Sequence, residues 1–395
     1  MIQDKMMGLG KKRSTIRELF EFGRQRKAAV GADKVFDFSL GNPSVPAPGA
    51  VEQAIRELLT EKDPVALHGY TSAQGDAGVR RVIAENLTAR YGINCDPDLI
   101  YMTCGAAASL TISLHAVTGP GDEVAVLAPY FPEYRVFVEK AGATLVEVPS
   151  LPGSFGLDLA ALEKAVGSKT AAIIVNSPNN PTGVVLTKEE LGALAALLTR
   201  KEKETGHPIY LISDEPYREL IYGGRKTALP AQAYPRTLTC YSYSKALSLP
   251  GERIGYIAVS PEMEEAGDVY AAVCGAGRAL GFVCAPALFQ YVAGKCDGVL
   301  PDLAAYDENR RLLTDGLREI GYETASPDGA FYLCVKAPDG DAKGFSERAK
   351  KYEILLVPGD DFGGKGWARL AYCVKKETIV NSLPAFGALF KEYQA

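Results

Sequence analysis

The amino-acid sequence predicts an α/β fold, in which a large domain has a mostly parallel seven-stranded sheet covered by helices and a smaller α+β domain accompanies it. Three observations lead to this prediction. Short apolar runs alternate with helical patterns between residues 99 and 260, polar side chains gather where those runs end, and both ends of the chain have a different pattern. Strands that alternate with helices need crossover connections, which make neighbouring strands parallel.

Seven short runs rich in β-branched and apolar residues are the expected strands: Leu99–Cys104, Glu123–Pro129, Thr144–Val148, Ala171–Asn176, Ile209–Asp214, Leu238–Ser242 and Ile254–Ser260. The clearest helical pattern lies at Lys188–Lys203, where leucines recur near helical spacing. Ligands of parallel sheets bind where the carboxyl ends of strands meet loops and helix N-termini. We therefore expect a functional site at the strand ends that carry polar or special residues, namely Gly105, Tyr130, Asn176–Gly183, Asp214–Tyr217 and Ser242–Lys245.

The two ends of the chain predict the smaller domain. Residues 1–45 hold a basic helical segment and the Gly/Pro-rich connector FSLGNPSVPAP. After about residue 286, helices are expected at 287–294, 302–320 and 344–351, and strands at 329–335, 354–358 and 368–373. We expect residues 46–285 to form the large ligand-binding domain, and residues 1–45 together with 286–395 to form the small one.

Composition excludes several classes of function. A net charge of −5 gives no general attraction to nucleic acid or to an anionic membrane. No apolar stretch is long enough to span a bilayer, and the charged N-terminal segment does not resemble a signal peptide. The eight scattered cysteines form no CxxC pair, which argues against a zinc site or a disulfide framework. We expect a cytoplasmic protein that holds any anionic cofactor by locally placed donors.

The motif SYSKALSLPGERIGY, residues 242–256, places Lys245 just after a strand, with Ser242 and Ser244 beside it and Arg253 further on. A lone lysine in such a loop is commonly a solvated side chain. The functional interpretation is a lysine that forms an imine, because burial and neighbouring charges readily lower the pKa of a lysine amine. The hydroxyls and the guanidinium would then hold a phosphate.

Three further motifs follow other strands. In ISDEPYREL, residues 212–220, Asp214 is either a helix N-cap or an anion that keeps a pyridine nitrogen protonated, with Tyr217 close enough to bond the same ring. NSPNNPTG, residues 176–183, predicts a turn that presents amide donors. CGAAASL, residues 104–110, predicts either plain packing or a helix N-terminus whose backbone N–H groups bind a phosphate.

In this order, SxSK with GxRxGY, NNPTG and DEPY resemble the aspartate aminotransferase superfamily, the class I/II aminotransferases of pyridoxal-5′-phosphate (PLP) fold type I. The resemblance runs from FSLGNP to GDDFGGKGWARLAY and so covers most of the chain. It implies that PLP is the cofactor, that Lys245 is its Schiff-base lysine and proton carrier, and that Asp214 pairs with the pyridinium nitrogen. Asn180 and Tyr217 would hydrogen-bond the ring oxygen, and Phe131 would stack on the ring.

The same resemblance implies further contacts. The residues expected at the cofactor phosphate are Gly105, Ala106, Ala107, Ser242, Ser244 and Arg253. Arg369 would clamp the substrate α-carboxylate, with Gly41 and Asn180 nearby. Tyr70 would reach the phosphate of a neighbouring subunit, which implies a homodimer with shared active sites.

Some positions keep an ordinary alternative. Arg369 also suits a surface ion pair, and Arg278, in GAGRALG, is either a surface arginine or a contact to a substrate carboxylate from the other subunit. The phosphate loop has alanines where many relatives supply a hydroxyl, and Phe131 stands where Trp or Tyr is common. The resemblance also implies cis bonds at Ala128–Pro129 and Asn180–Pro181.

The expected function is transfer of an amino group between an L-amino acid and a 2-oxo acid by a ping-pong mechanism. Glutamate and 2-oxoglutarate are expected as one pair, with aspartate, alanine or an aromatic amino acid in the other. The alternative is a PLP-dependent carbon–sulfur β-lyase, since it would share most cofactor contacts. A transcription regulator on this fold would need an N-terminal helix-turn-helix domain, for which the roughly 40 residues before the family-like region are too few.

Overall fold

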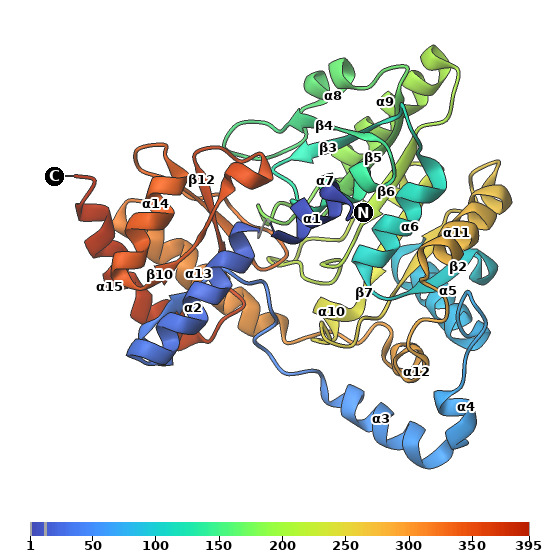
Figure 1. Ribbon diagram of the computed structural model, residues 1–395, viewed down its shortest axis with the longest axis horizontal. Coiled ribbons are helices and arrows are strands. Elements are labelled where there is room, and N and C mark those ends of the chain that lie inside the picture. Colours follow the sequence, from blue (N-terminus) through green and yellow to red (C-terminus); the bar gives the residue numbers. More distant parts are fainter. Residues whose placement is uncertain (1, 12–13, 395) are drawn as a thin grey trace.

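The computed structural model describes residues 2–11 and 14–394, which form a large domain and a smaller one side by side (Figure 1). The large domain is built on a seven-stranded sheet with the order β2-β8-β7-β6-β5-β3-β4. β8 runs antiparallel to both of its neighbours, and every other pair in this sheet is parallel. The expected α/β fold with a mostly parallel seven-stranded sheet is therefore confirmed.

The strands of this sheet match the expected ones to within one residue at each end: β2 (Ile100–Thr103), β3 (Glu123–Ala128), β4 (Thr144–Pro149), β5 (Thr170–Asn176), β6 (Tyr210–Asp214), β7 (Thr237–Ser242) and β8 (Gly255–Val259). Their side chains alternate between two cores, as a period of two residues requires. Ile174 and Ile212 face one core, whereas Ile173 and Leu211 face the other. Both faces of the sheet are thus buried, as is usual for parallel strands.

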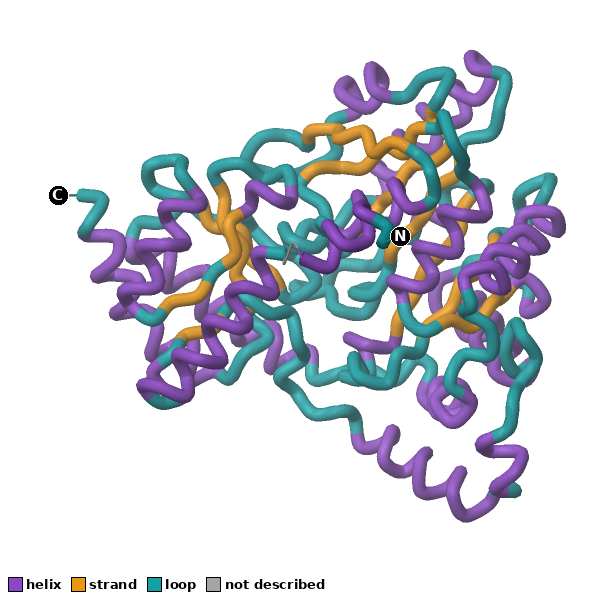
Figure 2. Tube along the Cα trace, viewed as in Figure 1, coloured by secondary structure: helices purple, strands orange, loops and turns teal. Residues whose placement is uncertain are grey.

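Helices cover both faces of the sheet (Figure 2). The helices of the large domain are α3 (Gly49–Glu61), α4 (Pro64–His68), α5 (Ala77–Tyr91), α6 (Ala106–Val117), α7 (Glu133–Lys140), α8 (Leu159–Ala165), α9 (Lys188–Thr205), α10 (Tyr243–Ala246), α11 (Ala266–Leu280) and α12 (Ala287–Cys296). α9 begins at the expected residue because Thr187 and Glu190 form a capping box, and it ends at Gly206 in a left-handed conformation.

The small domain combines the N-terminal segment with the C-terminal part of the chain. Its elements are α2 (Thr15–Val30), β1 (Phe36–Asp37), α13 (Leu303–Ile320), β9 (Tyr332–Lys336), α14 (Ala342–Ala349), β10 (Ile354–Leu355), β11 (Val357–Pro358), β12 (Trp367–Ala371) and α15 (Lys376–Lys391). β1 pairs in parallel with β10, and β11, β12 and β9 form an antiparallel sheet. One apolar core joins most of these elements, with Phe38 from the N-terminal side and Phe386 from α15 in contact, while Leu19 of α2 and Val357 of β11 form a small separate cluster.

The position of α12 bears on the boundary between the domains. The expected boundary at residue 286 assigns this helix to the small domain, whereas α12 packs on α3, α4 and α5 of the large domain. Val292 and Ala293 are buried in the same core as Val79 and Met102. We therefore propose that the large domain extends through Cys296.

Two arms of the chain span the domains. α1 (Asp4–Lys11) lies in front of the junction in Figure 1, and its Lys5 forms an ion pair of 3.6 Å with Glu139 of α7. Phe155, in the loop after β4, packs edge-on against Trp367 of β12 at a centroid distance of 5.0 Å. Within the described ranges, no helix is long and apolar enough to cross a membrane.

Candidate active site

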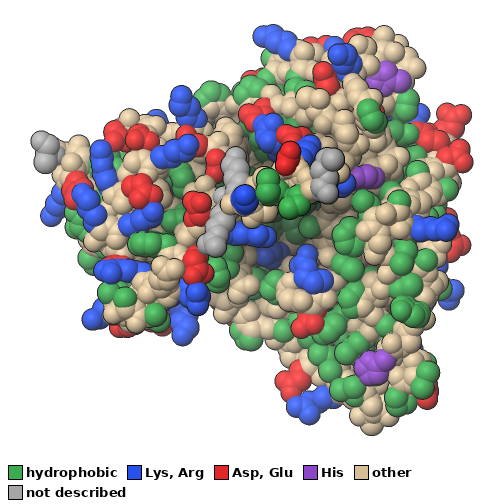
Figure 3. Space-filling view, in the orientation of Figure 1, with side chains coloured by type: hydrophobic (Ala, Val, Ile, Leu, Met, Phe, Trp, Pro, Cys, Tyr) green, Lys and Arg blue, Asp and Glu red, His purple; other side chains and the backbone are tan. Residues whose placement is uncertain are grey.

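The carboxyl ends of the central strands bring the expected polar residues together. Asn176 and Asp214 are register partners at the ends of β5 and β6, and β7 leads directly into α10 with Lys245. Asp214 and Lys245 border a cavity of about 290 Å³ between the two domains, and Figure 3 shows this face of the molecule hollowed there. The expected residues that line it are Gly41, Ala106, Ala107, Phe131, Asn180, Asp214, Tyr217, Ser242, Ser244, Lys245, Arg253 and Arg369.

Lys245 is held inside this cavity rather than in solvent. Its Nζ donates to the backbone oxygen of Gly41 at 2.7 Å and lies 5.3 Å from the centre of the Phe331 ring. Burial lowers the pKa of Lys245 to about 8, and the positive charges of Arg253 and Arg369 act in the same direction. An amine with this pKa is neutral for much of the time near pH 8, so it is ready to act as a nucleophile or a base.

Asp214 is buried at the end of β6, with only 5% of its surface exposed. Its Oδ2 accepts a hydrogen bond of 2.5 Å from the Tyr134 hydroxyl, while its Oδ1 is buried and has no hydrogen-bond partner. Burial raises the pKa of Asp214 to about 7, which the Tyr134 hydrogen bond opposes and the charge of Glu215 reinforces. A buried carboxylate that lines a cavity and has one unpaired oxygen needs a cationic hydrogen-bond donor to offset the cost of burying its charge.

Two tyrosines meet in the wall of the cavity. The hydroxyls of Tyr217 and Tyr332 are 3.0 Å apart, and their rings are perpendicular. Burial raises the pKa of Tyr217 well above its ordinary value, so the hydroxyl stays protonated and can donate a hydrogen bond to a ligand. Gly41 is required beside this pair, because a Cβ at that position would collide with the Tyr332 hydroxyl.

Arg369 is buried in β12, and its guanidinium faces the same cavity. It donates to Asn180 Oδ1 at 3.2 Å and to the backbone oxygen of Ser39 at 2.6 Å, and it lies over the Tyr332 ring at 4.7 Å. Its Nε has no partner, and the two acceptors of its guanidinium among the described residues are an amide oxygen and a backbone oxygen, not carboxylates. The surface ion-pair interpretation is therefore wrong, and the geometry suits an incoming carboxylate.

Another part of the cavity wall, at the N-terminus of α6, has hydrogen-bond donors that suit an anion. Gly105 caps α6 with a positive φ of 84°, so that Ala106 and Ala107 begin the helix with free backbone N–H groups. The Arg253 guanidinium packs against Gly105, where a Cβ would approach its Nη2 to 2.9 Å. Ser242 and Ser244 add hydroxyls 2.8 Å apart at the start of α10.

Three expected residues do not line the cavity of the single chain: Gly105, which lies directly before the lining residues Ala106 and Ala107, and the more distant Tyr70 and Arg278. Tyr70 is 97% exposed on the connection between α4 and α5. Arg278 is exposed near the end of α11, a helix that packs on α6 and β8. Neither side chain lines the pocket of its own chain.

Residues that the motifs did not assign also belong to the site. Tyr134 lies three positions after Phe131, and the two rings are edge-on at 5.7 Å. The spacing of the two aromatic residues at the start of a helix is the sequence signal that points to Tyr134. Ile16 and Leu40 line the cavity from the N-terminal segment, and no local motif marks either of them. The cis bonds are present at Ala128–Pro129 and Asn180–Pro181, and a third occurs at Ser177–Pro178.

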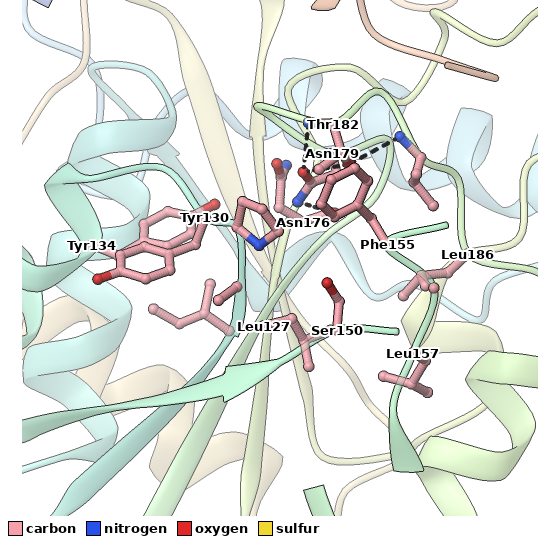
Figure 4. Close-up of a pocket in the computed structure, with 15 residues that line it drawn as sticks. Leu127, Tyr130, Tyr134, Ser150, Phe155, Leu157, Asn176, Asn179, Thr182 and Leu186 are labelled. Atoms are coloured by element: carbon pink, nitrogen blue, oxygen red, sulfur yellow. Dashed lines mark hydrogen bonds between the residues drawn. The ribbon is translucent and has the colours of Figure 1, made fainter. Parts of the chain in front are cut away.

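Tyr134 also lines a second, smaller cavity. This second cavity, of about 30 Å³, is lined by Tyr130 and Tyr134 on one side and by Asn176, Asn179 and Thr182 on the other (Figure 4). The Asn179 carboxamide oxygen accepts from the backbone and the hydroxyl of Thr182, which fixes the turn that carries Asn180. Residues that line the smaller cavity therefore hold the site in place, since Tyr134 binds Asp214 and Asn179 fixes the turn that carries Asn180.

The cavity residues fit PLP. The free Oδ1 of Asp214 suits a protonated pyridine nitrogen, the helix N-terminus with Ser242, Ser244 and Arg253 suits a phosphate, and Lys245 and Arg369 line the same cavity. In the part of the chain that the structure describes, acidic, histidine and cysteine side chains form no cluster that could bind a metal ion.

Comparisons with known proteins agree with this geometry. A family model described as aminotransferase class I and II matches residues 33–385. The crystal structure of an aminotransferase from Eubacterium rectale superposes with a TM-score of 0.98 at 52% identity, covering 100% of both chains. The aspartate/prephenate aminotransferase of Thermus thermophilus is 33% identical over 88% of both chains, and aromatic-amino-acid aminotransferase 2 of Thermococcus litoralis is 30% identical over 96% of both. The chain belongs to the class I and II aminotransferases.

Proposed function

We propose that this aminotransferase is PLP-dependent and works by a ping-pong mechanism, with Lys245 as the residue that binds the cofactor covalently. The observation that carries the proposal is one cavity that holds Lys245, the free Oδ1 of Asp214 and the unpaired Arg369 guanidinium. When bound, PLP supplies a pyridine ring that withdraws electrons from the substrate Cα. We expect glutamate and 2-oxoglutarate as one substrate pair, with aspartate, alanine or an aromatic amino acid in the other.

Each residue has a distinct task in this proposal. Arg369 binds the substrate α-carboxylate and fixes its orientation, so that the hydrogen on Cα points toward Lys245. Once the substrate amine has taken its place on the cofactor, the released Lys245 amine, whose pKa burial lowers, would remove that proton and return a proton later in the reaction. Asp214 holds its negative charge against the pyridine nitrogen, and this pairing favours ionisation of the carboxylate despite burial.

We also propose that two copies of the chain share their active sites. Tyr70 is 97% exposed although it is large and aromatic, which suits a side chain covered by a second subunit. Leu59, Val65 and Val283 are further exposed apolar side chains, on α3, on α4 and beside the Tyr70 loop. In a dimer built through this surface, Tyr70 would reach the cofactor phosphate in the other subunit. Arg278 would likewise come near the active site of the other subunit and not near that of its own.

Replacing Lys245 by alanine tests the central proposal. The wild-type protein should absorb near the visible edge with PLP attached, and reduction with borohydride should fix the cofactor to Lys245. Lys245→Ala should lose turnover and keep PLP only noncovalently. Lys336→Ala, which removes an exposed lysine paired with Glu323, is the control and should behave as wild type. Covalent labelling that persists in Lys245→Ala would contradict the assignment.

A spectral half-reaction separates the aminotransferase from the lyase alternative. An aminotransferase should convert its bound PLP to pyridoxamine phosphate with one equivalent of amino acid and release one equivalent of 2-oxo acid. A β-lyase should instead release pyruvate and ammonia from cystathionine without any 2-oxo acid acceptor. If pyruvate and ammonia are released faster than pyridoxamine phosphate forms, the lyase alternative is favoured.

A further inference from the structure

The substrate side of the cavity has an apolar wall. Four charged side chains line the described cavity, namely Asp214, Lys245, Arg253 and Arg369, and each already has a part in holding the cofactor or the α-carboxylate. Among the apolar side chains of the lining, Phe131 is expected on the cofactor ring, and Leu110 and Pro250 lie at the phosphate end, on α6 and beside Arg253. Ile16 and Leu40 lie near Arg369 instead, since Ile16 shares Phe362 with it and Leu40 follows Ser39. Since the four charges are committed, the side chain of a bound amino acid would meet Ile16 and Leu40 among the groups of its own chain.

Leu40 is placed where a substrate side chain must pass. The residue before it, Ser39, accepts a hydrogen bond from Arg369 at 2.6 Å, and the residue after it, Gly41, accepts from Lys245 at 2.7 Å. Leu40 therefore lies on the backbone segment between the α-carboxylate clamp and the lysine that faces Cα. Its side chain is 41% exposed, although it lines the cavity.

Ile16 approaches the cavity from a second element. It lies in the first turn of α2, which is held by the Ser14 cap and by a 2.6 Å hydrogen bond from Thr15 to Asp361. Ile16 packs against the small apolar cluster of Leu19, Val357 and Phe362. Two apolar side chains that remain partly exposed in the cavity gain most from an apolar ligand, because that ligand removes both from water.

We propose that the preferred amino donor has an uncharged apolar side chain, such as that of leucine, methionine or phenylalanine, in preference to aspartate. This inference rests on the proposed function and names the second substrate pair. The β-carboxylate of aspartate is one carbon from Cα, so against Ile16 and Leu40 it would lose water without gaining a cation from its own chain. Aspartate would be preferred only if Arg278 of the partner subunit reached that carboxylate. The carboxylate of glutamate is one methylene further out and can remain at the open mouth of the cavity.

Aspartate and leucine make a matched pair for the test, because both carry a branched group on one methylene. With the PLP-loaded enzyme, single-turnover conversion to pyridoxamine phosphate should be at least about 100-fold faster per molar leucine than per molar aspartate. A rate for aspartate equal to or above that for leucine would overturn the inference while leaving the aminotransferase intact. If no amino acid aminates the bound cofactor, the proposed function itself fails.

Adding a positive charge to the wall tests its role in the choice of substrate. Leu40→Arg places a cation on a partly exposed side chain and should reduce the leucine-to-aspartate ratio at least about tenfold, through a faster reaction of aspartate. Val380→Arg adds the same charge on α15, at a side chain that is 45% exposed and does not line the cavity, and should leave the ratio unchanged. Ile16→Arg is the second variant if Leu40→Arg does not fold. An unchanged ratio in the folded wall variant would overturn the placement.

Discussion

The two ends of the cavity, which we propose bind the cofactor and the substrate and call the cofactor end and the substrate end, are built in different ways. At the cofactor end, Asp214, Ser242 and Lys245 follow neighbouring strands of one sheet, and the register of β5, β6 and β7 fixes their separation. At the substrate end, Arg369 comes from the small domain and meets Asn180 of the large domain and Ser39 of the N-terminal segment. The first end depends on a rigid sheet, whereas the second depends on three segments that are far apart in the sequence.

This difference predicts how each end responds to substitution. A change at the cofactor end removes a preorganised charge and should reduce the rate of chemistry without altering how substrates are selected. A change at the substrate end should act on kcat/KM and on the choice of substrate, because it alters binding of the α-carboxylate and of the side chain. The predictions below test this contrast, from the largest expected effect to the smallest.

Asp214→Asn should have the largest effect. The amide keeps the shape of the side chain but cannot hold a negative charge against the pyridine nitrogen. Removing one preorganised electrostatic group typically costs about 10²–10³-fold in rate, and we expect kcat to fall about 10³-fold. Steady-state kinetics with saturating PLP measure this, and a variant with an unchanged kcat would contradict the role of Asp214.

The same substitution should stabilise the protein without cofactor. The pKa of Asp214 is raised to about 7 in the folded chain from an ordinary value of 3.8, so its contribution to stability is complete below pH 4 and is lost as the pH rises through 7. Asp214→Asn avoids that loss. At pH 8 its free energy of unfolding should exceed that of the wild-type protein by roughly 2–4 kcal/mol. Urea unfolding of the cofactor-free protein at pH 8 and pH 4 checks the sign, since the gain should shrink at the lower pH.

Arg369→Lys should have the next largest effect, confined to the substrate end. Lysine keeps the charge but not the fork of donors that binds Asn180, Ser39 and an incoming carboxylate together. Loss of one partner of a buried charged contact costs roughly 2–5 kcal/mol, so we expect kcat/KM to fall about 10²-fold or more. The dissociation constant for PLP should stay unchanged, and a matching loss of PLP binding would remove the contrast between the two ends.

The sequence predicted the cofactor end better than the substrate end for a physical reason. SYSK, DEPY and NNPTG each follow a strand directly, so local sequence determines both the side chain and its place on the sheet edge. Arg369 was identified by resemblance, because the sequence near it does not show that β12 faces Asn180. Ile16 and Leu40 were not predicted at all, since their place in the cavity depends on how the N-terminal segment returns across the domains.

The strand boundaries were equally predictable, because alternation between two buried cores leaves a strong apolar pattern. The boundary between the domains was harder to place, since α12 has ordinary helical sequence and only its packing on α3 and α5 shows where it belongs. Tyr134 lies only three positions after Phe131, yet its hydrogen bond to Asp214 joins α7 to β6 across 80 positions of sequence. Contacts of that kind are not visible in a single sequence.

Tyr134→Phe should give the smallest effect, at the cofactor end. The Tyr134 hydroxyl lowers the pKa of Asp214 against the upward effects of burial and of Glu215, so removing it should move that pKa upward. Fewer molecules then have an ionised Asp214 at pH 7, and PLP should bind about tenfold more weakly there, the scale of one hydrogen bond to a charged group. At pH 9 the carboxylate is ionised in both proteins, and the difference should largely disappear.

Tyr130→Phe is the matched control for this measurement. Its ring stacks on Tyr134 at 6.3 Å, but its hydroxyl donates to Glu147 at 2.7 Å and does not contact Asp214. Titration of the cofactor-free protein with PLP between pH 6 and 9 should show a shifted midpoint in Tyr134→Phe alone. A shift of equal size in both variants would mean that packing around α7, and not the hydrogen bond to Asp214, determines the affinity. The substrate preference should be unaltered in either variant, because neither hydroxyl contacts the apolar wall.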